Sequence, residues 1–138
     1  MRMYGATNGL FREAVKTYQV PDESLVIEKG TKVMIPIYSI HHDPKYYPDP
    51  YTFDPQRFSP EEKAKRVSST YLPFGDGPRF CIGKRFAELE MKMVLSQILT
   101  TFRVLPCEKT EVPIKFKSGL PLLVARNGIF LRFQSISK

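Results

Sequence analysis

The segment Phe74-Gly75-Asp76-Gly77-Pro78-Arg79-Phe80-Cys81-Ile82-Gly83 decides how the rest of this sequence is interpreted. It is a glycine-rich loop followed at once by residues 84–102, which contain neither glycine nor proline. Apolar side chains in that stretch recur at helical spacing and cover well over half of the circumference. We therefore expect one long helix that is largely buried in a larger structure.

The spacing of the glycines excludes two kinds of phosphate-binding loop. A Walker loop has four residues between its glycines and continues with Lys and then Ser or Thr. Here five residues separate Gly77 from Gly83, and Lys84 is followed by Arg85. A dinucleotide-binding fingerprint would need a third glycine three residues after Gly77, and none stands there.

Cys81 precedes the expected helix by three residues and is the residue of this loop that carries chemistry. Flanking glycines let backbone N–H groups approach its sulfur, and the helix dipole favours a thiolate. Arg79 adds a positive charge, and two phenylalanines add apolar bulk. Two alternatives remain open at this point: a buried structural cysteine, and a catalytic nucleophile with His41 or His42 as its base.

The spacing Phe74-x-x-Gly77-x-Arg79-x-Cys81-x-Gly83 resembles the haem-binding signature of the cytochrome P-450 monooxygenases at all five fixed positions. The resemblance implies that the Cys81 thiolate is the axial ligand of the haem iron. It further implies that Arg79 binds a haem propionate and that Phe74 packs beside the thiolate. Gly77 and Gly83 would allow the backbone to approach the sulfur and the porphyrin closely.

Other segments resemble the same family. Pro55-Gln56-Arg57-Phe58 is similar to its P-x-R-F element, whose arginine joins a structural network with the Glu and Arg of an E-x-x-R helix. Arg2 stands where that second arginine would be, and the Glu would precede Met1. Arg12 resembles the second propionate-binding arginine. Arg2 and Arg57 are thus expected to be structural, and Arg12 to contact the cofactor.

The likeness runs from Arg2 to about Phe133 and is closest to animal microsomal members, especially insect xenobiotic-metabolising ones. His41-His42-Asp43-Pro44 resembles the approach to the family's meander, which implies structural roles for both histidines. One segment departs from the pattern: Gly5–Gly9 stands where the family usually has a proline-rich step.

The fold class implied is an α+β fragment of the mainly-α cytochrome P-450 fold. It would comprise a small hairpin sheet, a proline-rich meander coil, the haem-binding loop, one long buried helix and C-terminal β-hairpins. Residues 1–138 would form the C-terminal, haem-binding part of a single domain whose distal half is absent.

Residue patterns place the smaller elements. The N-terminal part should form a meander of short strands near 17–20, 25–27 and 32–35. Five prolines in residues 36–57 predict a long coil with at most one helical turn before Asp43. Ser59-Pro60-Glu61-Glu62 predicts a short capped helix. After the long helix, strands are expected at 102–105, 112–116, 120–125 and 129–133.

Composition and residue spacing argue against several other classes of protein. The chain has 138 residues, 42% of them hydrophobic, and a net charge of 21 − 14 = +7. Its basic residues are scattered along the sequence, which disfavours nucleic-acid binding. The two cysteines form no C-x-x-C pair, which disfavours a disulfide framework or a zinc site. No apolar run suits a membrane anchor or a signal peptide, so the chain alone is expected to be soluble.

The resemblance implies an oxidoreductase that inserts one oxygen atom of O2 into a lipophilic small molecule. Haem would be its cofactor, and electrons would come from NADPH through a reductase. The longer protein expected to contain this chain, called the full-length parent below, would lie on the cytoplasmic side of the endoplasmic reticulum membrane. The oxygen-activating residues would lie upstream, so no catalytic residue is expected here. The alternative is a catalytically incompetent truncated product without stable haem binding.

Overall fold

The computed structural model describes residues 1–120 and 122–136. Contacts divide the chain into two compact units, Met1–Pro73 and Phe74–Lys138, here called unit 1 and unit 2. Each is described by itself.

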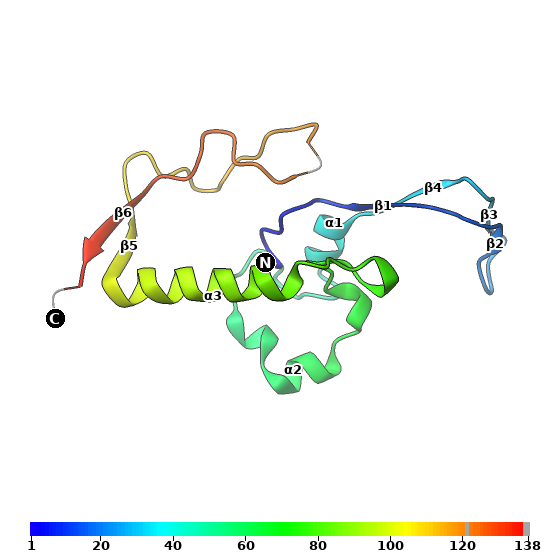
Figure 1. The fold of residues 1–138 in the computed structure, drawn as a ribbon, viewed down its shortest axis with the longest axis horizontal. Coiled ribbons are helices and arrows are strands. Elements are labelled where there is room, and N and C mark those ends of the chain that lie inside the picture. The colour runs from blue at the N-terminus through cyan, green and yellow to red at the C-terminus, as the bar shows by residue number, and fades with distance from the viewer. Residues whose placement is uncertain (121, 137–138) are drawn as a thin grey trace. The chain divides into compact units, whose positions relative to one another are not determined.

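Unit 1 begins with four short strands that pair in a nested order (Figure 1). Strand β1 (Leu10–Glu13) pairs antiparallel with β4 (Lys32–Ile35), and β2 (Tyr18–Gln19) pairs antiparallel with β3 (Val26–Ile27). The expected strands near 17–20, 25–27 and 32–35 are confirmed. The expectation of a sequential meander is wrong, since β4 returns to β1, a strand that the sequence did not reveal.

Backbone hydrogen bonds explain this nesting. Gly30 has a left-handed φ of 87°, and its N–H donates to the Ala14 carbonyl at 2.8 Å. The Ala14 N–H donates in turn to the Thr31 carbonyl at 3.0 Å. The turn at Gly30 therefore sends the chain back along β1 before β4 begins.

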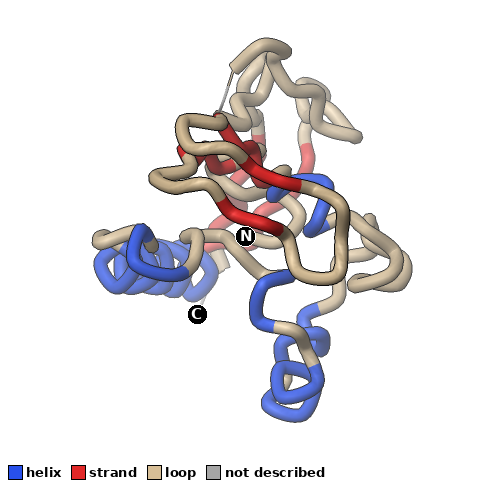
Figure 2. The backbone as a smooth tube through the Cα atoms, turned by 90° about the vertical axis from the view of Figure 1, so that its right-hand side faces the viewer, coloured by secondary structure: helices blue, strands red, loops and turns tan. Residues whose placement is uncertain are grey.

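The rest of unit 1 is mainly coil, as the tan stretches of Figure 2 show. The proline-rich stretch contains one helical turn before Asp43, as predicted. Four short helical elements interrupt the coil: α1 (Ile37–His41), η1 (Pro55–Phe58), α2 (Pro60–Lys65) and η2 (Ser68–Thr70). Helix α2 begins where predicted, and the Ser59 hydroxyl accepts a hydrogen bond from the Glu62 N–H at 3.3 Å.

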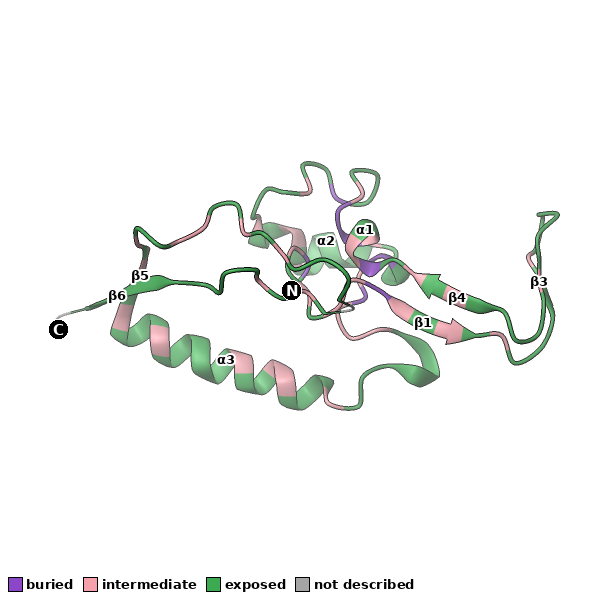
Figure 3. Cartoon of the chain, turned by 90° about the horizontal axis from the view of Figure 1, so that it is seen from above, coloured by how far each residue is buried: buried purple, intermediate pink, exposed green. Residues whose placement is uncertain are grey.

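The core of unit 1 is small and unusually polar. Its buried residues gather around α1 and the coil after it (Figure 3). Besides Gly9, three are hydrophobic and four are polar or charged: Ile37, Tyr47, Leu72, Arg2, His41, His42 and Thr70. A buried polar group is stable only when it is hydrogen-bonded, so the partners of these side chains hold the unit together.

Unit 2 contains a short turn η3 (Gly77–Arg79), the long helix α3 (Lys84–Thr101) and a pair of strands. Helix α3 ends one residue earlier than predicted. No described residue of unit 2 is buried, and α3 shows only exposed and intermediate positions in Figure 3. The burial of α3 in a larger structure stays a prediction.

The C-terminal strands differ from the expected series. Strand β5 (Phe102–Pro106) pairs antiparallel with β6 (Leu131–Ser135), at the end of α3 in Figure 1. Residues 112–116 and 120–125 form no strand in their described part and contribute one isolated bridge between Phe116 and Ala125. Pro113 lacks the N–H that a ladder requires, and residue 121 lies outside the described part. Among the described residues, none of the helices has the length and hydropathy that a membrane crossing requires.

Candidate functional site

The glycine-rich loop of unit 2 is closed by a backbone hydrogen bond. The Cys81 N–H donates to the Phe74 carbonyl at 2.8 Å. Gly75 and Gly77 adopt left-handed φ values of 72° and 70°, which glycine accepts without strain. The Asp76 carboxylate accepts a hydrogen bond from the Gly77 N–H at 2.8 Å. The loop therefore presents Cys81 from a defined turn that ends at α3.

The Cys81 thiol is free and exposed at the N-terminal end of α3. Gly83 is the cap residue of the helix, and a Cβ built on it would lie 3.9 Å from the Cys81 Sγ. The exposure of this thiol does not favour the alternative of a buried structural cysteine. A Cβ at the Gly83 position would be in ordinary van der Waals contact with the sulfur, and α3 begins at the next residue.

Apolar and cationic side chains accompany the thiol. Phe80, Ile82 and Phe86 are 56%, 100% and 72% exposed. Arg79 is exposed as well, and within the described part of the chain its guanidinium forms no hydrogen bond or ion pair. A free thiol, an apolar surface and an unpaired guanidinium suit an iron porphyrin, which offers a metal, a flat apolar ring and carboxylates.

Arg12, the second expected propionate ligand, lies on β1 of unit 1 opposite Val33. It is half-buried, and its guanidinium donates to the neighbouring Phe11 carbonyl at 2.9 Å. Its contact with the cofactor stays a prediction.

Arg2 and Arg57, the two expected network arginines, both lie in unit 1. Arg2 is 4% exposed and donates to the carbonyls of His41 at 2.7 Å and Thr52 at 3.4 Å. Arg57 donates to the Asp49 carbonyl at 3.2 Å, and its Nε has no hydrogen-bond partner. Burial, and next the charge of Arg57, lower the pKa of Arg2. The Arg57 Nε lies 3.7 Å from the Asp54 carboxylate, so one acidic side chain accompanies this pair of guanidinium groups.

The position that sequence reasoning missed is Arg66. Its guanidinium lies 4.4 Å from the ring centre of Phe58 and 5.3 Å from that of Tyr71, and it donates to the Arg57 carbonyl. Tyr47 lies between Arg66 and Arg2, with its ring centre 5.9 and 5.0 Å from the two groups. A lone arginine in a polar stretch carries no sequence pattern that could have revealed this contact.

The histidines are structural in this unit. Both ring nitrogens of His41 are hydrogen-bonded, to the Arg2 carbonyl at 3.2 Å and to the Leu72 N–H at 2.9 Å. His42 stacks on Tyr38 with ring centres 4.1 Å apart, and its Nδ1 lies 2.8 Å from the Tyr38 carbonyl. These contacts leave His41 no free nitrogen with which to serve as a base for Cys81.

Cys107 provides a comparison within unit 2. It is half-buried, and its N–H donates to the Thr110 hydroxyl at 2.7 Å. The same hydroxyl lowers the pKa of the Cys107 thiol. This cysteine belongs to a hydrogen-bonded turn after β5 and lacks the flanking glycines and the helix start that surround Cys81.

Comparison with known proteins agrees with the geometry of the cysteine loop. The model of the family described as cytochrome P450 matches residues 1–133. This chain belongs to the cytochrome P450 family. The family consists of haem-containing monooxygenases, a class of oxidoreductases.

Curated relatives include several insect cytochromes P450. "Probable cytochrome P450 6a13" of Drosophila melanogaster is 45% identical over 100% of this chain, and cytochrome P450 6a2 of the same species is 48% identical over 99%. Cytochrome P450 9e2 of Blattella germanica is 49% identical over 90% of the chain. The matched part covers 28%, 27% and 24% of these three relatives, so the chain spans about a quarter of their length.

Proposed function

We propose that this chain supplies the proximal haem-binding face of a haem-thiolate monooxygenase, with Cys81 as the axial ligand of the iron. The observation that carries the proposal is the free, exposed thiol at the start of α3, beside a glycine and an apolar surface. Haem bound to a thiolate supplies the oxygen activation by which one atom of O2 is inserted into a substrate.

The residues of this chain would bind and orient that cofactor. Arg79 and Arg12 would pair with the propionates, since a guanidinium binds a carboxylate through parallel hydrogen bonds. Phe74 would pack beside the sulfur and exclude water from it. Gly77 and Gly83 would keep side-chain atoms away from the sulfur and the ring, and the first turn of α3 would favour the ionised thiolate.

Both units would belong to one cytochrome P450 domain of the full-length parent. A cavity of about 620 Å³ lies beside Arg2 and Phe58 in unit 1, and its lining is mostly apolar. The segment before Met1 in the parent would cover this cavity. It would also bring the expected glutamate to Arg2 and Arg57.

The parent would oxidise a lipophilic small molecule with electrons from NADPH, delivered by a reductase. The insect relatives favour the endoplasmic reticulum membrane as its location. Lys84 and Arg85 are exposed on the first turn of α3, where they could dock an acidic surface of the reductase.

The test replaces each cysteine separately in the full-length parent. Cys81→Ser should abolish the strongly red-shifted Soret band of the ferrous carbonyl complex, whereas the matched control Cys107→Ser should keep it. A red-shifted band that survives in the Cys81 variant would overturn the assignment. Absence of the band from the wild-type parent would favour the alternative of a product without stable haem binding.

A further inference from the structure

Two exposed hydroxyl groups follow helix α2 in unit 1. After the helix, Arg66 and Val67 continue in extended backbone, with ψ angles of 135° and 121°. Ser68 and Ser69 come next, and both are exposed. Within the described part of the chain, neither of their hydroxyls forms a hydrogen bond. The next hydroxyl, that of Thr70, is buried and donates to the Val67 carbonyl at 2.7 Å, so it is not available to another protein.

The residues before Ser68 are basic. Lys63 and Lys65 lie five and three residues before it and are exposed, and Arg66 lies two residues before it. The Lys65 side chain is 70% exposed. Protein kinases with an acidic substrate groove select a serine by basic side chains that precede it. The charge pattern and the exposure of Ser68 therefore suit a kinase of this class.

Arg66 distinguishes Ser68 from its neighbour Ser69. The Arg66 guanidinium lies 4.4 Å from the ring centre of Phe58 and 5.3 Å from that of Tyr71. It is half-buried, and it is the basic residue three positions before Ser69. A kinase would find this side chain held by aromatic rings, so Ser68 is the better acceptor of the two.

The surroundings of Arg66 are rich in cations. A cavity of about 180 Å³ is lined by Arg57, Lys65 and Arg66 and by one carboxylate, that of Glu62. Glu62 pairs with Lys65 at 2.6 Å, and the Arg57 Nε lies 3.7 Å from the Asp54 carboxylate. Among the described residues, no acidic side chain pairs with Arg66. Arg66 is thus the cation of this group that lacks an anion.

We propose that Ser68 is a phosphorylation site for a serine kinase that recognises basic residues, and that its phosphate becomes the anionic partner of Arg66. The Ser68 Oγ forms a bond to the γ-phosphorus of ATP, the bond to the bridging oxygen breaks, ADP leaves, and a base of the kinase takes the hydroxyl proton. The phosphate brings a charge of about −2 and binds a guanidinium through parallel hydrogen bonds. The proposal goes beyond the proposed function, because it does not depend on Cys81 being an iron ligand.

The first measurement locates the phosphate. The folded full-length parent is incubated with ATP and the catalytic subunit of cAMP-dependent protein kinase, and a synthetic peptide of residues 61–73 is the positive control. Trypsin then releases residues 66–79 or 67–79, in which tandem mass spectrometry assigns the modified hydroxyl. Phosphate should appear on Ser68, should be lost in Ser68→Ala and should remain in Ser69→Ala. Lys65→Gln should lower kcat/KM for this site about tenfold, as expected for one lost charge-assisted contact, whereas the exposed control Lys29→Gln should not.

The second measurement tests the role of Arg66. Urea unfolding is compared between the phosphorylated and the unmodified parent. Phosphorylation should lower the equilibrium constant of unfolding about tenfold, as expected for one charge-assisted hydrogen bond. In Arg66→Gln this effect should vanish, in Arg66→Lys part of it should remain because the charge is kept, and in the exposed control Arg126→Gln it should be complete.

Three results overturn the proposal. The first is phosphate on the peptide but not on the folded parent, or on neither. The second is phosphate on Ser69 or Thr70 in place of Ser68. The third is an equal effect of phosphorylation on unfolding in the wild type, in Arg66→Gln and in Arg66→Lys.

Discussion

At the scale of single residues, unit 1 contains one buried and two half-buried arginines that bond to backbone carbonyls. Arg2 bonds to two carbonyls, Arg57 to one, and Arg66 to one while it stacks on aromatic rings. The His41 carbonyl is buried and would retain its full desolvation cost without the Arg2 donor, so this bond stabilises the coil more than a surface ion pair would. A planar guanidinium can bond to carbonyls and stack on aromatic rings at the same time, which an ammonium group does less well.

Arg57 should be structural and not catalytic. Arg57→Ala removes the donor to Asp49 and the cation that lies 3.7 Å from the Asp54 carboxylate. We expect a loss of about 1–3 kcal/mol in the free energy of unfolding and loss of bound haem from the full-length parent. The haem-to-protein ratio and the urea midpoint measure this, with exposed Arg126→Ala as the matched control. A variant with full haem content and no turnover would show a catalytic role instead.

His41 should make the stability of the parent depend on pH. Its pKa is lowered from 6.5 to about 4, mainly by burial; the charges of His42 and Arg2 also lower it, and the bond to the Arg2 carbonyl opposes them. Tyr47 and Tyr71 face the ring as well. The unfolded chain binds the proton more tightly than the folded chain, so acid favours unfolding. The free energy of unfolding should be unaffected above the unfolded pKa of His41, and it should fall by about 2 kcal/mol by about pH 5.

Urea unfolding of the full-length parent as a function of pH measures this loss. His41→Gln removes the titrating group and keeps the acceptor, so its stability should lack that part of the acid slope. His42→Gln serves as the control at the neighbouring position. Equal acid slopes in the wild type and in His41→Gln would contradict the prediction.

At the scale of elements, helix α2 depends on its N-cap residue, Ser59. The Ser59 hydroxyl accepts the Glu62 N–H at 3.3 Å and lowers the pKa of Glu61 through a further hydrogen bond. Ser59→Ala should cost about 1 kcal/mol and should raise the pKa of Glu61 toward its ordinary value. Unfolding measurements and NMR titration of Glu61 check both, with exposed Ser68→Ala as the control. An unchanged Glu61 titration would show that this hydrogen bond is absent in solution.

Local signals made some elements predictable. The cap at Ser59 placed the start of α2, and the uninterrupted stretch from Lys84 placed both ends of α3 within one residue. Strand β1 could not be predicted, because only its pairing with β4 makes Leu10–Glu13 a strand. The strands after Pro106 were overpredicted, in part because Pro113 lacks the N–H that a ladder requires.

The candidate site likewise has a part that the sequence could predict and a part that it could not. Residues Phe74–Gly83 follow a fixed spacing, so the sequence alone could name every member of the cysteine loop. The contacts of His41, Tyr47 and Arg66 join residues 23 to 39 positions apart, or stack a cation on several rings, and no local pattern encodes them. Long-range polar contacts of this kind become visible only in the structure.

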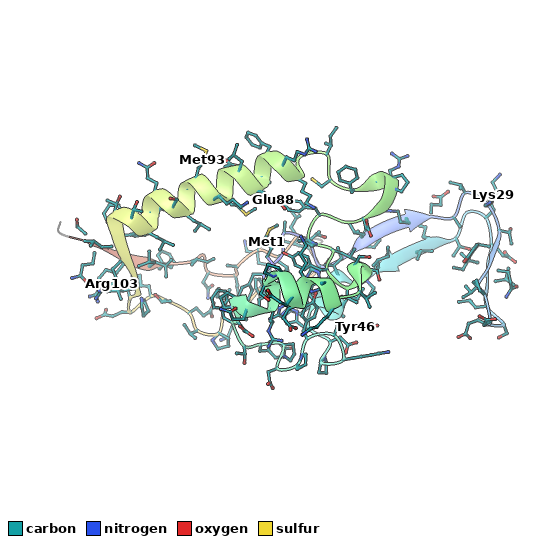
Figure 4. The ribbon with its side chains drawn as sticks, turned by 90° about the horizontal axis from the view of Figure 1, so that it is seen from below. Met1, Lys29, Tyr46, Glu88, Met93 and Arg103 are labelled. Carbon is teal, nitrogen blue, oxygen red and sulfur yellow. The ribbon has the colours of Figure 1, made fainter. Side chains whose placement is uncertain are left out.

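At the scale of the whole molecule, many large apolar side chains are exposed to solvent. Leu89 and Met93 on α3 are 59% and 63% exposed, and Figure 4 shows Met93 projecting from a different side of the helix than Glu88. No described residue of unit 2 is buried. Exposed apolar faces of this kind mark surfaces that associate with other protein surfaces.

The 138-residue chain should therefore associate when it is prepared alone. We expect oligomers, no cooperative unfolding transition, and no NADPH-dependent oxidation after refolding with haemin and addition of a reductase, because a haem bound to this face alone would stay open to water. Sedimentation, near-UV circular dichroism and NADPH consumption measure these properties.

Leu89 and Met93 are four residues apart and share one face of α3, so a double replacement by Gln should increase the monomer fraction of the isolated chain. In the full-length parent the same pair should be covered, and the same double variant should lower the free energy of unfolding by about 2 kcal/mol or more, because two amides would then be buried. Lys92→Gln on the polar face of α3 is the control and should change neither property. A monomeric chain with a cooperative transition and measurable turnover would contradict the prediction, and would mean that the cysteine loop and α3 need no further cover to hold a reactive haem.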